Sequence, residues 1–286
     1  SSAASDVYKR QEFIDGPEWT FMDLKIKSLQ KARILKSLNL KAGDNLTVII
    51  EDPKEFILYW IASNFLGVMF IALNTAIKGK GLLHQINTSK SKHVIVENLF
   101  FDEVNNLKNT YKLDIEILNC GELKNKELVK ESEVTFGKLS DNVCTMFTSG
   151  TSGPSKGVMM PNAHCVLFAV GTIENYELKH DHIFYISLPL FHANGLFMQL
   201  LACIITGAKA IIRKRFSASN WLKDVRKYDV THTNMLGAIA AFVVAQPTSE
   251  HDKDHKLVVI GSAPLPSEPE RIFRERFGVK QVMPLY

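Results

Sequence analysis

Residues 46–73 read LTVIIEDPKEFILYWIASNFLGVMFIAL and indicate the class of fold. LTVII and VMFIAL, at the two ends, are apolar runs of strand length, and the apolar run Phe56–Phe65 between them is long enough for a helix. An apolar strand, a helix and a second apolar strand predict a parallel pair joined by a right-handed crossover. Strands that are apolar throughout are buried on both faces, which is typical of the α/β class.

The same stretch raises the possibility of a transmembrane helix, because Phe56–Leu73 carries no charge over a length that could span a bilayer. Gly67 divides it into a helix-like half and a β-rich half, and Asn64 would lie inside the membrane. We therefore expect a buried helix that leads into a buried strand, and no integral membrane segment.

The alternation continues and predicts an α/β protein with largely parallel sheets flanked by helices. Thr20 can cap a helix that ends at Ala42–Asp44, and another helix is expected near Gly81–Thr88. Further strands are expected at His93–Val96, Ile115–Leu118, Val143–Phe147, Ile183–Ser187, Ala208–Arg213 and Leu257–Gly261. The polar segment Gly121–Lys138 predicts a surface connection between two sub-sheets, roughly residues 12–120 and 140–286.

The first residues, SSAASDVYKRQ, resemble a translated linker, so we interpret residues 1–11 as a non-native leader outside the fold. They contain no apolar core and so predict no signal peptide.

Composition narrows the classes of partner. The chain has 34 basic and 30 acidic residues, a net charge of +4, spread without a basic face or tail, which argues against nucleic acid but leaves anionic small molecules as partners. Its four cysteines form no CxxC pair, and its histidines show no metal-ligand spacing, so we expect no disulfide framework, no metal site and a reducing, cytoplasmic setting. The oligomeric state cannot be read from the sequence.

The segment TSGTSGPSKG, residues 148–157, follows the apolar strand VCTMF and precedes a helix that Asn162 could cap. Its glycines can turn backbone amides toward an anion, its hydroxyls can donate to phosphate oxygens, and Lys156 can neutralise a terminal phosphate. A flexible Gly/Ser loop is the plainer alternative. A P-loop is a sharper one, but Ser155 stands where that pattern needs glycine and Gly157 where it needs Ser or Thr.

TSGTSGPSKGV resembles the phosphate-binding loop of the adenylate-forming (AMP-binding) superfamily, which includes acyl-CoA synthetases, luciferases and peptide-synthetase adenylation domains. The resemblance extends from about Trp19 to Tyr286 and includes PLFHANG at 189–195 and GSAPLP at 261–266. It implies that residues 12–286 are part of the large N-terminal domain, without the C-terminal domain. It also implies nucleotide-binding roles for Thr148, Ser149, Gly150, Thr151, Ser152, Gly153, Lys156, Gly261, Ser262, Ala263, Pro264 and Tyr286.

PLFHANG places His192 and small residues just after the strand expected at Ile183–Ser187, at the edge where α/β sheets bind ligands. By resemblance His192 lines the acid pocket beside the α-phosphate, although a packed loop histidine is the alternative on residue type alone. GSAP, residues 261–264, would let a flat ring or acyl chain approach the backbone, or would form a tight turn before a helix at Pro266. Tyr286 matches a tyrosine that stacks on adenine.

The function implied is ATP-dependent activation of a carboxylic acid to acyl-AMP, followed by thioester formation with coenzyme A, with ATP, Mg²⁺ and coenzyme A as cofactors. Lys156 and His192 are the predicted catalytic residues. An adenylation domain that loads a carrier protein and a non-catalytic nucleotide-binding relic remain alternatives, and the chain as given is expected to be inactive. Residues 216–247 and ERFGV at 275–279 look most like crotonobetaine/carnitine-CoA ligases, which suggests fatty acid or carnitine metabolism. The acid itself cannot be read from the sequence.

Overall fold

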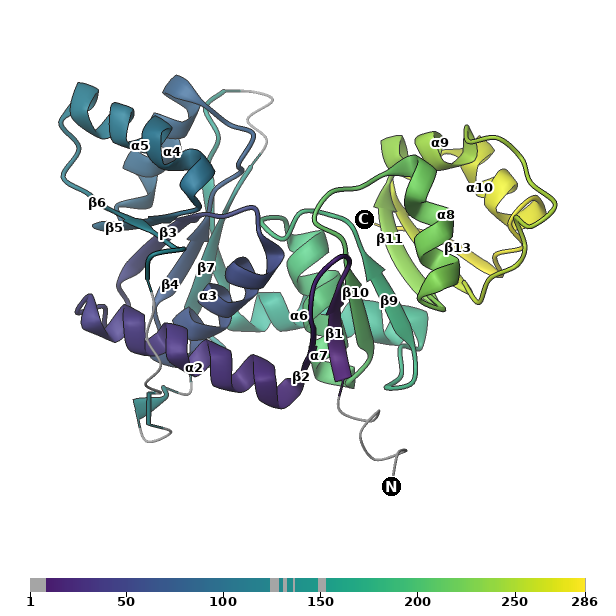
Figure 1. Ribbon diagram of the computed structural model, residues 1–286, viewed down its shortest axis with the longest axis horizontal. Helices are drawn as coiled ribbons and strands as arrows, with labels where there is room; N and C mark the ends of the chain where they lie inside the picture. The colour runs from purple at the N-terminus through teal and green to yellow at the C-terminus, as the bar shows by residue number, and fades with distance from the viewer. Residues whose placement is uncertain (1–8, 124–128, 131–132, 136, 149–152, 286) are drawn as a thin grey trace. The chain divides into compact units, whose positions relative to one another are not determined.

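The computed structural model describes residues 9–123, 129–130, 133–135, 137–148 and 153–285. The chain forms two compact units (Figure 1), which we call the first unit, residues 22–165, and the second unit, residues 1–21 with 166–286. Each unit is a largely parallel sheet flanked by helices, which confirms the α/β class expected from the strand–helix alternation.

The sheet of the first unit has the strand order β6-β5-β3-β4-β7-β8 within the described residues. All neighbours are parallel except β7 and β8, which form an antiparallel pair. Helices α4 and α5 lie on one face and α2 and α3 on the other (Figure 1). The strands are β3 (Asn45–Ile49), β4 (Met69–Ala72), β5 (His93–Val96), β6 (Glu116–Asn119), β7 (Asn142–Phe147) and β8 (Gly157–Pro161). The helices are α2 (Phe21–Ser37), α3 (Pro53–Leu66), α4 (Gly79–Ser89) and α5 (Asn98–Tyr111).

The apolar stretch from Phe56 forms helix α3 and then strand β4, as the sequence predicts. The Asp52 side chain accepts a hydrogen bond from the Lys54 N–H, Pro53 is the first helical residue, and Gly67 ends the helix in a left-handed conformation with φ of 65°. Helix and strand are buried in the unit's core. Of the helices described here, none is both long and apolar enough to cross a membrane.

The sheet of the second unit has the order β13-β12-β11-β9-β10-β1-β2 among the described strands, and only β1 and β2 pair antiparallel. Helices α8, α9 and α10 cover one face through Trp221, Val243 and Phe273, while α6 and the helix that begins at Asn194 lie against the other. The strands are β1 (Lys9–Phe13), β2 (Glu18–Thr20), β9 (Ile183–Ile186), β10 (Lys209–Ile212), β11 (His232–Leu236), β12 (Val259–Ala263) and β13 (Gln281–Pro284). The helices are α6 (Asn162–Tyr176), η2 (Asn194–Leu201), α7 (Ala202–Thr206), α8 (Ala218–Lys227), α9 (Gly237–Val244) and α10 (Ser267–Glu275).

The division between the sheets differs from the predicted boundary at about 120–140. Strands β7 and β8 belong with β3–β6, whereas β1 and β2 cross to the other sheet, where β1 pairs with β10. The segment 121–138 therefore connects two strands of one sheet, and its described parts bond to helices, as in the Thr135 N–H to the Phe65 carbonyl at 2.7 Å. Local patterns indicate that strands exist but not which distant strand each one joins.

The prediction that residues 1–11 lie outside the fold is wrong for residues 9–11. Residues 9–11 form the start of β1, and Gln11 pairs with Ala210 and is fully buried. A strand is held by backbone hydrogen bonds that any residue except proline can make, so polar letters did not reveal it.

Candidate functional site

The segment predicted to grip phosphate begins and ends on a hairpin of the first unit. Its arms, β7 and β8, pair from Asn142–Pro161 to Phe147–Gly157. Beyond the last pair, the Thr148 N–H donates to the Lys156 carbonyl at 2.9 Å, and the Lys156 N–H donates to Thr148 Oγ1 at 3.0 Å. These two bonds fix the Lys156 backbone opposite the Thr148 hydroxyl, and both side chains remain exposed.

Helix α4 holds the second arm of the loop. His84 Nε2 lies 2.8 Å from the Ser155 carbonyl oxygen, and the Gln85 side-chain amide donates to Ser155 Oγ at 3.1 Å. The Ser155 hydroxyl accepts this bond, so its own proton stays available to an oxyanion. His84 and Gln85 were not among the predicted site residues, and nothing in their local sequence signals the contact.

Gly153 has φ of +145°, with open space where a side chain would be, so this position suits glycine and leaves the backbone accessible. Ser149, Gly150, Thr151 and Ser152, which the sequence assigns to phosphate binding, lie outside the described residues, as does the predicted adenine-stacking Tyr286.

In the second unit, His192 lies in the turn between β9 and η2, a π-helix. The His192 N–H donates to the Pro189 carbonyl at 3.2 Å, and the His192 carbonyl accepts from Leu196 at 3.0 Å. The side chain is exposed and tilted against the Phe191 ring, with centroids 5.1 Å apart. Partial desolvation lowers the pKa of His192, which favours the neutral imidazole at physiological pH.

Gly195 is required by close packing. A Cβ at this position would lie 2.5 Å from the Pro189 carbonyl oxygen, so only glycine lets η2 approach the backbone that precedes His192. This contact makes the His192 turn compact.

A buried chain of polar side chains connects η2 to the sheet. The Gln199 amide donates to Asn194 Oδ1 at 2.9 Å, the Asn234 amide donates to the same oxygen at 3.0 Å, and the Tyr176 hydroxyl donates to Asn234 Oδ1 at 2.6 Å. Asn234 lies in the middle of β11 and is fully buried. The three hydrogen bonds limit the positions of Asn194, Asn234 and Tyr176, while the Gln199 Oε1 is buried without a partner among the described residues. The sequence analysis did not identify this network, because β11 reads HTNML and has no apolar pattern in which a buried asparagine would stand out.

Gly261, Ser262 and Ala263 lie within β12 rather than in a loop after it, since the strand runs two residues further than expected. A Cβ on Gly261 would lie 1.7 Å from the Tyr176 hydroxyl oxygen. On that face, therefore, Tyr176 fills the space that the sequence left for a ring or acyl chain. Ser262 is also buried, and Ala263 and Pro264 carry the exposed surface of the motif.

The structure thus brings the predicted residues together in two groups. Thr148 and Lys156 face each other in the first unit. In the second unit, the turn that carries His192 is joined through Asn194 and Asn234 to the strand that pairs with Gly261. Across the described ranges, no cluster of three His, Cys, Asp or Glu side chains could hold a metal ion.

Comparison with known proteins identifies the family of the chain. A family model described as AMP-binding enzyme matches residues 2–286. Long-chain fatty acid transport protein 6 of Mus musculus is 27% identical over 97% of this chain and 47% of its own length. The 2-succinylbenzoate–CoA ligase of Bacillus licheniformis is 30% identical over 92% of this chain and 54% of its own length. The chain spans about half the length of these curated relatives.

Solved structures share the fold. O-succinylbenzoate coenzyme A synthetase (MenE) of Bacillus subtilis, in complex with AMP, matches with a TM-score of 0.82 and 24% identity over 94% of this chain and 55% of that chain. ATP-bound MatB from Rhodopseudomonas palustris matches with a TM-score of 0.83 and 19% identity over 96% and 56%. Because the family model covers almost every residue, the chain belongs to the AMP-binding enzyme family.

Proposed function

We propose that the complete protein is an acid–CoA ligase, which activates a carboxylic acid with ATP as its acyl-adenylate and then forms the thioester with coenzyme A. The observation that carries the proposal is the hairpin neck, where Thr148 and Lys156 hold each other through two hydrogen bonds and present a hydroxyl and an ammonium group. The Thr148 hydroxyl takes part in this pairing, whereas the Lys156 side chain takes no part in it and is left to contact a ligand.

In the proposed first step, a carboxylate oxygen attacks the α-phosphorus of ATP, and pyrophosphate leaves with the bonding electrons. Lys156 and the Thr148 hydroxyl stabilise the negative charge that develops on the leaving phosphates. Mg²⁺, when bound, would neutralise phosphate charge as well. In the second step, a thiol attacks the acyl carbonyl, and AMP leaves.

His192 is proposed to position the acid. Desolvation favours its neutral imidazole. The single N–H of that neutral ring can donate a hydrogen bond to a carboxylate or phosphate oxygen, so His192 does not have to be positively charged. The bonds through Asn194 and Asn234 limit the movement of the turn that carries it.

The coenzyme A acceptor is favoured over a carrier protein because named relatives are CoA ligases, including the Bacillus licheniformis protein and a medium/long-chain-fatty-acid–CoA ligase of Mycobacterium marinum at 26% identity. The test below addresses the identity of the carboxylic acid, and an activity on crotonobetaine or carnitine stays a prediction from sequence resemblance. A cytoplasmic, reducing setting belongs to the same proposal and is supported by four free cysteines.

The test is acid-dependent ATP–pyrophosphate exchange by the complete protein with a panel of acids: long-chain fatty acids, medium-chain fatty acids, o-succinylbenzoate and crotonobetaine. We expect exchange with at least one acid, and consumption of coenzyme A with the same acid. Exchange without coenzyme A consumption would favour the carrier-protein alternative. If no acid supports exchange while ATP still binds, the nucleotide-binding relic is correct and the proposed activity is wrong.

A further inference from the structure

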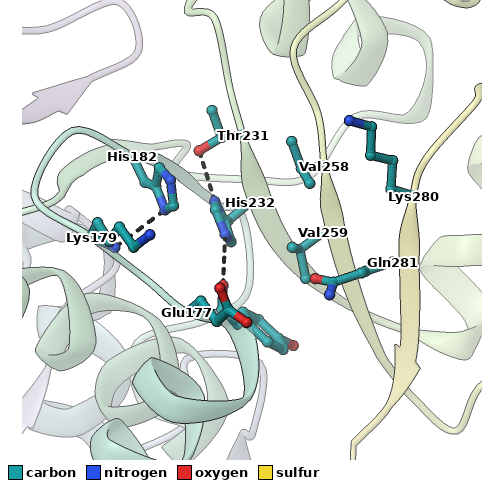
Figure 2. A pocket seen from close by; sticks show the side chains of 10 residues that line it. Glu177, Lys179, His182, Thr231, His232, Val258, Val259, Lys280 and Gln281 are labelled. Carbon is teal, nitrogen blue, oxygen red and sulfur yellow. Dashed lines mark hydrogen bonds between the residues drawn. The ribbon is translucent and has the colours of Figure 1, made fainter.

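A second concave site lies in the second unit, at the edge of the sheet where strands β9, β11, β12 and β13 begin (Figure 2). It is a pocket of about 320 Å³ at the opposite ends of these strands from His192 and Pro264. The residues that line it are Tyr176, Glu177, Lys179, His182, Thr231, His232, Val258, Val259, Lys280 and Gln281. The predicted nucleotide-binding and acid-binding residues are not among them.

Two stacked imidazoles form one wall of this pocket. The rings of His182 and His232 lie 4.5 Å apart at 29° (Figure 2). Both nitrogens of His232 are used, with Nδ1 2.7 Å from Thr231 Oγ1 and Nε2 3.3 Å from the Tyr176 carbonyl oxygen. Burial and the neighbouring His182 lower the pKa of His232 to about 4, so His232 is a neutral, fixed support.

His182 presents the donor. The Lys179 N–H donates to its Nδ1 at 3.2 Å, so the neutral ring carries its proton on Nε2. No partner of that Nε2–H is found in the described part of the chain. Because Nδ1 is already occupied as an acceptor and both nitrogens of His232 are engaged, the pair offers a hydrogen-bond donor and no lone pair for a metal ion.

The charges around the pocket favour an anion. Lys179 and Lys280 both line it, and neither has an ion-pair partner among the described residues. Their backbones are held, because the Lys179 carbonyl accepts from His182 at 3.1 Å and the Lys280 carbonyl accepts from Arg274 at 3.1 Å. Glu177 is the opposing charge. Among the lining residues, two ammonium groups and one carboxylate leave a net positive charge beside an imidazole N–H and the Gln281 amide. The Asp181 carboxylate acts on His182 as well, but Asp181 is not part of the lining.

We propose that this pocket binds a small oxyanion, a phosphoryl or carboxylate group, between Lys280, Lys179 and the Nε2–H of His182. The anion neutralises the two ammonium groups and accepts a hydrogen bond from the Nε2–H of His182. The apolar floor of Val258 and Val259 lies beside these donors and leaves room for an attached carbon group. The site is separate from the proposed catalytic chemistry and does not depend on it.

Isothermal titration calorimetry with sulfate and with malonate distinguishes a phosphoryl ligand from a carboxylate ligand. Sulfate has the tetrahedral shape of a phosphoryl group, and malonate supplies carboxylates. All titrations use protein that carries Lys156→Ala, because this change removes the cation of the predicted nucleotide site, where the probes could also bind. We expect saturable binding of at least one probe, weakened at least tenfold by Lys280→Gln and by His182→Gln. Glu177→Gln, a matched change that removes the opposing charge, should tighten binding several-fold.

Sulfate affinity should rise as pH falls from 8 to 6, because sulfate keeps its charge over this range while an anion-bound His182 gains a proton. The charged and titratable groups that face His182 are Lys179, His180, Asp181, Glu177, His232 and Lys280. The proposal is wrong if neither probe binds, or if Lys156→Ala and the three pocket variants made in it bind the probe with equal affinity. Retained acyl-CoA synthesis by the pocket variants of the complete protein would show that the two sites are independent.

Discussion

Lys156 is fixed by its backbone and not by its side chain. Both hydrogen bonds to Thr148 involve the Lys156 N–H or carbonyl, so a substitution of the side chain leaves the hairpin neck intact. The exposed ammonium group can therefore be removed with little effect on folding, which makes this residue a clean test of the proposed phosphate grip.

Lys156→Ala is expected to slow acyl-adenylate formation by the complete protein about tenfold to a thousandfold, because a cation that stabilises the leaving pyrophosphate is lost. Pre-steady-state measurement of adenylate formation gives the rate. Lys156→Arg, which keeps the charge, is the matched control and should retain more activity than alanine. A rate equal to that of the wild type in Lys156→Ala would remove this residue from the mechanism.

His192→Ala distinguishes a pocket residue from a packed loop residue. Since the imidazole is exposed and the turn is held by backbone bonds and by Gly195, we expect a melting temperature close to that of the wild type together with impaired acid turnover. The measurements are thermal unfolding and steady-state kinetics with a saturating acid. A large fall in melting temperature with unchanged kinetics per folded molecule would support packing instead.

Gly261→Ala should destabilise the second unit by about 3 kcal/mol, because the new methyl group would meet the Tyr176 hydroxyl and push it away from Asn234. Denaturant unfolding measures the change. Gly171→Ala is the matched control: Gly171 lies in α6 with no atom within 4 Å of its Cβ position, so alanine there should stabilise by about 0.5–1 kcal/mol. Equal stability of the two variants would mean that Tyr176 moves aside easily.

At the scale of elements, sequence patterns predicted best where a segment is apolar throughout. The strands β3, β4, β5 and β7 and the helix α3 lie within a few residues of their predicted ranges. The sequence analysis missed β8, whose Val158 and Met159 are exposed, and β11, whose His232 and Asn234 are buried polar residues. β11 reads HTNML and lacks the apolar signal on which such predictions depend, whereas β8 reads GVMMP and is a short run that begins at the last glycine of the segment 148–157. Pairing partners were missed as well, because register and sheet membership arise from long-range packing.

Helix ends show a correctable local strain. Lys112 ends α5 in a left-handed conformation, with φ of 54° and an exposed side chain. Lys112→Gly should therefore stabilise the first unit by about 0.5–1 kcal/mol, since glycine adopts this conformation at little cost. Lys108→Gly, inside the same helix, is the control and should destabilise by about 1 kcal/mol. Chemical unfolding compares them, and destabilisation by both changes would mean that Lys112 contributes contacts that outweigh its backbone strain.

For the whole molecule, the sequence predicted the α/β class and the motif residues but not how these residues are held. The hydroxyls and the lysine of residues 148–157 can be recognised in the sequence, whereas the support from His84, Gln85, Tyr176 and Asn234 depends on contacts between residues 58–71 positions apart. The pocket around His182, at the edge where β9, β11, β12 and β13 begin, was also missed, because its lining comes from four separate segments. Sequence spacing carries information about chemistry only when the participating residues are neighbours in the chain.

The two units should respond differently to acid. His182, His192, His232 and His255 all lie in the second unit, and desolvation lowers the pKa of each below its ordinary value of 6.5. In this pH range the unfolded chain binds more protons than the folded unit, so stability is present above about pH 6.5 and is lost as pH falls toward the folded-state pKa values. For His232, with a pKa of about 4, the loss is about 2 kcal/mol at pH 5.

Hydrogen-exchange mass spectrometry at pH 7.5 and pH 5 can follow peptides from each unit separately, once intrinsic exchange rates are corrected for pH. Protection in β9, β11 and β12 should fall at pH 5, whereas protection in β3, β4 and β5 should change little, since His182, His192, His232 and His255, whose pKa values are lowered, lie in the second unit. His232→Gln, which keeps a donor for the Tyr176 carbonyl but cannot titrate, should reduce the loss in the second unit. Equal loss of protection in both units would show that acid acts through global unfolding and not through these buried imidazoles.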